Sequence, residues 1–140
     1  MNTSFAIEQN ISIIAGSYRC DLHNDFDFFA LEYLPMEKRL FLDWRICPLS
    51  SPPKESPSRL RLMFESMERL SVQARGKNAD YADDKCVNSI SFSAPGLEKD
   101  FDAISDVYRS DEEHLSISFM SGFGIKIWAA RGLHEVTLRG

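Results

Sequence analysis

The stretch LSISFMSGFGIKIWA, residues 115–129, decides the fold. Its apolar side chains recur at every second position on both sides of a short central segment, residues 120–124, and that period is typical of β-strands. Isoleucine, phenylalanine and tryptophan favour strands, while Gly122 and Gly124 supply the backbone freedom that a tight turn requires. The stretch therefore predicts a β-hairpin.

A similar pattern occurs 55 residues earlier, in residues 60–74. This segment is ambiguous, because its apolar residues also fall at helical spacing, with Pro57 in a first-turn position and Gly76 as a cap. The parallel with residues 115–129 favours two strands around the segment ESMER, residues 65–69. The matched positions are Leu60, Leu62, Phe64, Ser66, Leu70, Val72 and Ala74, which correspond to Leu115, Ile117, Phe119, Ser121, Ile125, Ile127 and Ala129.

The remaining segments complete a strand-rich pattern in one domain, residues 1–140. FFALEYLP and KRLFLDWRIC alternate as a strand pair, VNSISFSA is a short strand, AARG reads as a turn and LHEVTLRG as a final strand. One helix is predicted near residues 97–109. We therefore expect a mainly β fold, an antiparallel β-sandwich or open barrel with one short helix; the alternative is an α+β fold with a helix at about 57–75. The expected core is Phe29, Leu31, Tyr33, Leu40, Leu42, Trp44, Leu62, Phe64, Val72, Ile90, Phe92, Ile117, Phe119, Ile125 and Ile127.

The charge balance narrows the classes of partner. Twenty-one acidic and sixteen basic residues give a formal net charge of −5, which disfavours a nucleic-acid binder and suits a basic protein partner. No apolar run approaches the length of a membrane span, so no membrane association is expected. Cys20, Cys47 and Cys86 form no CxxC pair and fit free thiols in the cytoplasm.

The segment CDLHNDFDFF, residues 20–29, contains the densest set of chemically active side chains. Asp21, His23 and Asp25, with Asp27 beside them, have the donor atoms of a zinc, manganese or iron site. The competing interpretation is a polar turn, in which these side chains bond nearby backbone before the next strand begins. No HExxH, HxH or CxxC motif supports the metal site, so the sequence favours the turn and predicts no cofactor.

Neither Cys20 nor Cys47 lies in a recognisable nucleophile motif, and both are expected to be small buried residues. We therefore expect a non-catalytic binding domain rather than an enzyme. Its contact residues are sought in the polar loops 21–27, 48–58 and 77–85. The third loop combines Tyr81 with Asp83 and Asp84, a set that suits a basic partner, and Trp128 is a second candidate on the sheet face opposite Ile125 and Ile127.

Three runs carry a resemblance: CDLHNDFDFFALEYLPMEKRLFLDWRI, LRLMFESMERLSV and LSISFMSGFGIKIWAARGLHEVTL. Together they resemble a broad group of small bacterial β-rich proteins, some of which look like immunity proteins of contact-dependent or polymorphic toxin systems. The resemblance implies a small, acidic, cytoplasmic protein that binds a toxin domain stoichiometrically. The leading hypothesis is thus an immunity-type inhibitor, and the alternative is a metal-binding protein or metal-dependent enzyme using Asp21, His23 and Asp25.

Overall fold

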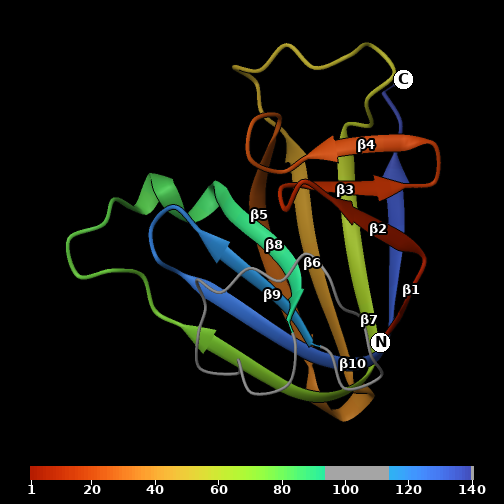
Figure 1. Ribbon diagram of the computed structural model, residues 1–140, viewed down its shortest axis with the longest axis vertical. Coiled ribbons are helices and arrows are strands. Elements are labelled where there is room, and N and C mark those ends of the chain that lie inside the picture. The colour runs from red at the N-terminus through yellow and green to blue at the C-terminus, as the bar shows by residue number, and fades with distance from the viewer. Residues whose placement is uncertain (94–113, 140) are drawn as a thin grey trace.

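The computed structural model describes residues 1–93 and 114–139, which form two β-sheets (Figure 1). The helical elements among these residues are two short 3₁₀ turns, and the helix predicted near 97–109 lies outside them. The elements are β1 (Asn2–Thr3), β2 (Phe5–Glu8), β3 (Ser12–Ala15), β4 (Tyr18–Asp21), β5 (Phe26–Leu34), η1 (Pro35–Glu37), β6 (Arg39–Ile46), β7 (Arg59–Gln73), η2 (Tyr81–Lys85), β8 (Val87–Ser93), β9 (His114–Phe119) and β10 (Gly124–Thr137).

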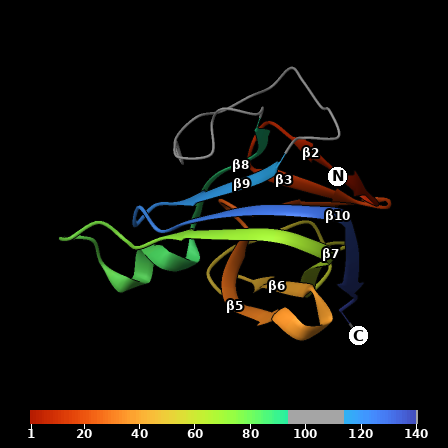
Figure 2. The same ribbon diagram turned by 90° about the horizontal axis from the view of Figure 1, so that it is seen from below.

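The large sheet has the strand order β5-β6-β7-β10-β9-β8, and β1 adds to β10 in parallel. The hairpin predicted from residues 115–129 is confirmed as β9 and β10, with Gly122 at a positive φ of 87° in the turn. Viewed from below, the large sheet is curled, with β8 and β9 above β10 and β7 and with β6 and β5 below them (Figure 2). The Phe28 ring of β5 reaches the Phe119 ring of β9, with centroids 5.1 Å apart. The fold is therefore mainly β, a half-open barrel, as predicted.

The ambiguous segment at 57–75 is neither a helix nor two strands. It is the single strand β7, and it bends at Ser66, which has a positive φ of 54°. β10 is also continuous through AARG, where a turn was expected, and its register with β7 shifts between Trp128 and Ala129, opposite the extra residue Glu68 of β7. The two strands pair with each other on both sides of these irregularities, so a bend replaces each expected turn and coils the sheet.

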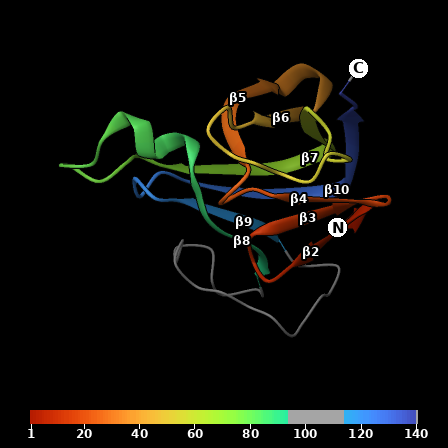
Figure 3. The ribbon, with the colours of Figure 1, turned by 90° about the horizontal axis from the view of Figure 1, so that it is seen from above.

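The small sheet has the order β2-β3-β4 and crosses the inner face of the long strands (Figures 1 and 3). Its apolar side chains share one core with the large sheet. The Phe5 ring meets the Phe64 ring edge to face, with centroids 6.4 Å apart. The close approach occurs above Gly132, where a Cβ atom would lie 3.1 Å from each ring.

Most of the predicted core is buried, including Trp44, and Phe92 is half-buried. The prediction is wrong at Phe29, Leu31, Tyr33 and Val72, whose side chains are exposed. Three of them lie on β5, a terminal strand of the sheet, and the bulge between Phe28 and Ala30 changes the alternation that the sequence suggested. Val72 lies in the part of β7 beyond its pairing with β6, where the described strands border β7 on the β10 side alone.

Candidate functional site

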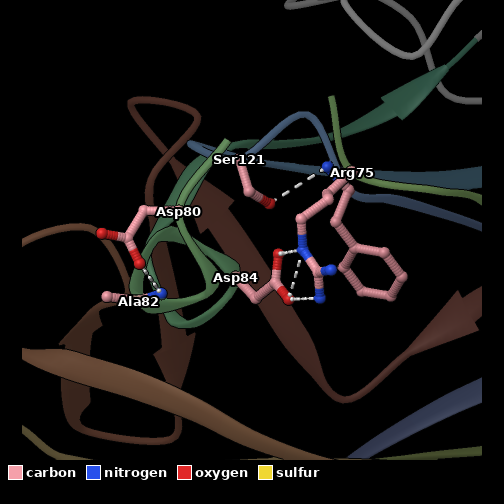
Figure 4. Close-up of polar contacts among 6 residues, drawn as sticks. Arg75, Asp80, Ala82, Asp84 and Ser121 are labelled. Atoms are coloured by element: carbon pink, nitrogen blue, oxygen red, sulfur yellow. Dashed lines mark hydrogen bonds and ion pairs between the residues drawn. The ribbon is translucent and has the colours of Figure 1, made fainter. Parts of the chain in front are cut away.

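The loop between β7 and β8 is folded by its own polar residues. Asp80 caps η2, because its carboxylate accepts a hydrogen bond from the Ala82 amide at 2.9 Å. Arg75, which follows β7, donates to the Asp84 carboxylate from Nε at 3.1 Å and from Nη2 at 2.5 Å (Figure 4). This bidentate pair joins the two ends of the loop.

Arg75 also lies over the Tyr81 ring, with its guanidinium carbon 3.8 Å from the ring centroid. Tyr81 is nevertheless 77% exposed, although the guanidinium lies over its ring. The hydrogen bond from Arg75 holds the pKa of the Asp84 carboxyl below its ordinary value. The same hydrogen bond raises the pKa of the Arg75 guanidinium. The result is an exposed aromatic side chain held in place by an ion pair.

An open pocket of about 380 Å³ lies between η2 and β5. Its floor is apolar, since Phe123 packs on Phe119 and Phe28 packs on both Phe119 and Trp44. Charged groups stand at its rim, so the pocket suits an apolar side chain next to a polar or charged one. The lining residues are Phe28, Phe29, Ala30 and Leu31 of β5, Tyr81, Asp84 and Lys85 of η2, and Arg75 and Phe123.

The structure brings Tyr81, Asp83 and Asp84 together on η2, as the sequence placed them, but their roles differ. Tyr81 and Asp83 are exposed, whereas Asp84 is half-buried and bonded to Arg75. Asp84 thus holds the loop through its ion pair with Arg75. Arg75 was missed in the sequence, although a cation directly after a strand and a few residues before an acidic loop is a detectable signal.

The segment at 21–25 is the polar turn favoured by the sequence. The Asp21 carboxylate accepts hydrogen bonds from the His23 and Asn24 amides at 3.0 and 2.8 Å. Asp25 accepts one from the Ser50 hydroxyl at 2.5 Å, and the His23 ring contacts the Val87 carbonyl at 2.7 Å. Within residues 1–93 and 114–139, no group of three or more His, Cys, Asp or Glu side chains is placed to hold a metal ion. Asp21, His23 and Asp25 therefore do not form a ligand set there.

The cysteines are free thiols, as predicted. Cys20 is fully buried, and burial raises the pKa of its thiol to about 12, so at neutral pH it is a protonated core residue. Cys47 and Cys86 are half-buried rather than fully buried. Burial also raises the pKa of the Cys86 thiol.

Trp128 is half-buried, and its ring is used within the molecule. It stacks on His114, with centroids 4.4 Å apart, and the Arg69 guanidinium lies 4.4 Å from its centroid. Lys126 lies two residues before Trp128, on the same face of β10. It is fully buried, with its Nζ 3.2 Å from the His114 Nε2. These intramolecular contacts make Trp128 a weaker contact candidate than Tyr81.

Comparison of the chain with protein-family models, with curated proteins and with solved structures finds no match. In the part of the chain that the structure describes, no helix has the length and apolar character needed to cross a membrane.

Proposed function

We propose that this protein is a non-catalytic protein-binding domain that contacts its partner through η2 and the pocket beside it. The observation that carries the proposal is Tyr81, which is 77% exposed while Arg75 and Asp84 hold it in one position. Aromatic anchors of this kind dominate binding energies, and an anchor that is already ordered loses less entropy when a partner docks.

The partner we propose is a basic protein. The chain has a net charge of −5, and Asp80 and Asp83 lie at the exposed end of the loop. A basic partner would be steered to this surface, so its association rate should fall as the salt concentration rises. The resemblance to immunity proteins makes a toxin domain, bound and inhibited in a one-to-one complex, the specific form of this proposal.

The test begins with a partner purified from the native cell together with the protein, identified by mass spectrometry and then titrated in pure form by calorimetry. We expect Tyr81→Ala to weaken binding by about thirtyfold, the level of an interface hot spot. The matched control is Met36→Ala on η1, which removes a 95% exposed apolar side chain away from the pocket and should leave the affinity unchanged.

Equal affinities for Tyr81→Ala and the wild-type protein would reject η2 as the contact site. A toxin partner is tested separately, by titrating its activity with the protein. We expect complete inhibition at a one-to-one ratio, and an active toxin in the saturated complex would reject the immunity role while leaving binding through η2 intact.

A further inference from the structure

The outer edge of β5 is open. β5 is a terminal strand of the large sheet and, among the described residues, pairs with β6 alone. Within the described residues, residues 28–34 make no backbone hydrogen bond outside the β5–β6 ladder. At the other end of the strand order, the Ile90 amide of β8 donates to the Asn10 carbonyl at 2.7 Å. An open edge presents unpaired amides and carbonyls that accept another strand.

Open edges are usually protected by charged side chains, proline, a bulge or short length. β5 has a bulge between Phe28 and Ala30 and the charged Glu32, but no lysine or proline within Phe26–Leu34. It is nine residues long and exposes Phe29, Leu31 and Tyr33 by 38%, 36% and 41%. The second half of β7 provides an internal comparison, because it also extends beyond its pairing with β6. That edge exposes two adjacent charged residues, Glu68 and Arg69, whereas β5 exposes the single charged residue Glu32 between Leu31 and Tyr33.

The two faces of β5 differ in the side chains they offer. Leu31 and Tyr33 are register partners of the buried Leu42 and Leu40, so they belong to the inner face of the sheet, where the η2 pocket lies. Glu32 is the register partner of Phe41 and belongs to the outer face. A strand added to this edge would therefore meet apolar groups and a carboxylate alternately.

Charge decides which occupant fits. The charged side chains of β5 are Asp27 and Glu32, both carboxylates. The guanidinium groups of Arg45 and Arg59 lie over the Phe29 ring, 5.2 and 5.1 Å from its centroid, so the edge is positive beside Phe29 and carries a carboxylate at Glu32. A second copy of this chain would bring the same carboxylates and a further net charge of −5 to the edge. A strand with a basic residue opposite Glu32 would be attracted there instead.

We propose that the free edge of β5 binds an extended segment of the partner, in which apolar side chains alternate with lysine or arginine. The segment adds as a strand to the large sheet, so that its basic side chains face Glu32 on the outer face. Its apolar side chains pack beside Leu31 and Tyr33 on the inner face, and one of them enters the η2 pocket. This inference rests on the proposed function and adds the conformation and chemistry of the bound segment.

The probe is an octapeptide of alternating lysine and valine, with an octapeptide of alternating glutamate and valine as the charge control. We expect the lysine peptide to bind about tenfold more tightly than the glutamate peptide at low salt. Residue-resolved hydrogen exchange on the full-length protein should show protection of alternate amides between Phe29 and Leu34, and a proline in the middle of the peptide should abolish it.

Two variants with the same change of charge show whether the peptide binds at the edge of β5 or at the edge of β7. Glu32→Lys should reverse the preference between the peptides, whereas Glu68→Lys on β7 should leave it unchanged, and both positions are exposed, so folding is preserved. Peptide binding that protects β7 or no strand at all would overturn the inference. Protection of β5 that depends on protein concentration without peptide would overturn it in favour of a second copy.

The native partner separates this inference from the proposed function. If the η2 contact and the strand addition are both correct, Tyr81→Ala and Glu32→Lys each weaken binding of the native partner. Binding that is weakened by Tyr81→Ala but not by Glu32→Lys would support the η2 contact and reject strand addition. Binding that is weakened by Glu32→Lys alone would reject η2 as the anchor and support the edge of β5 as the binding site.

Discussion

Gly132 shows how one residue fixes the distance between the two sheets. The Phe5 and Phe64 rings approach so closely at this point of β10 that a Cβ atom would lie 3.1 Å from a ring carbon of each. In the sequence this glycine suggested a turn within AARG, because glycine is common in turns. The cause here is instead close packing across the core, which depends on the Phe5 ring of β2 and is therefore invisible in the sequence around Gly132.

We expect Gly132→Ala to lower the free energy of unfolding by about 1–3 kcal/mol, the usual cost of overpacking a tight core. Chemical denaturation measures the change. The control is Ala130→Ser at an exposed position of the same strand, which should stay within about 0.5 kcal/mol of the wild type. Equal stabilities of the two variants would show that the rings move apart without cost.

At the scale of elements, the sequence predicted what depends on local alternation and missed what depends on neighbours. The hairpin of β9 and β10 was predictable, because strand-favouring residues flank a glycine turn. The buried face of β6 was predictable for the same reason. The exposure of Leu31 was not, because its alternation is that of a core strand and only the strand order shows that β5 lies at an edge. For the candidate site, the sequence pointed to Tyr81 through the composition of its loop, but the support of Tyr81 by Arg75 depends on the closed loop and was not visible in the sequence.

The ion pair that closes the loop should make the structure of η2 depend on pH. The pKa of Asp84 is lowered in the folded protein, so the ion pair with Arg75 stabilises η2 fully above the ordinary aspartate pKa of about 3.9. The stabilisation is lost as the pH falls through the lowered folded pKa. We therefore expect the amides of η2 to keep their NMR shifts down to about pH 4 and to change below it.

Asp84→Asn should loosen η2 already at neutral pH, whereas Asp83→Asn, which changes an exposed carboxylate of the same turn, should not. Amide exchange of residues 81–85 reports both. A wild-type transition centred above the ordinary aspartate pKa, or identical behaviour of the two variants, would contradict the assignment of Asp84 as the residue that holds the loop.

For the whole molecule, the strand order predicts slow folding. β1 pairs with β10, so that Asn2 lies beside Arg131, and β7 pairs with both β6 and β10. Sheets built from pairings so distant in sequence fold in roughly milliseconds to seconds. Stopped-flow refolding followed by fluorescence, with the fully buried Trp44 as one reporter, should show a phase in that range. Complete refolding in a few microseconds would contradict it.

The central position of β10 also has a consequence during synthesis in the cell. β10 is bordered by β7, β9 and β1, yet it follows these three strands in the chain and leaves the ribosome after them. Until then β1 has no partner, β7 has β6 on one side only, and the two halves of the large sheet cannot join. Ribosomes add about 5–20 residues per second, so the incomplete chain exposes apolar strands for several seconds. Chaperones that hold nascent chains should therefore matter more for producing this protein than for a helical domain of equal length.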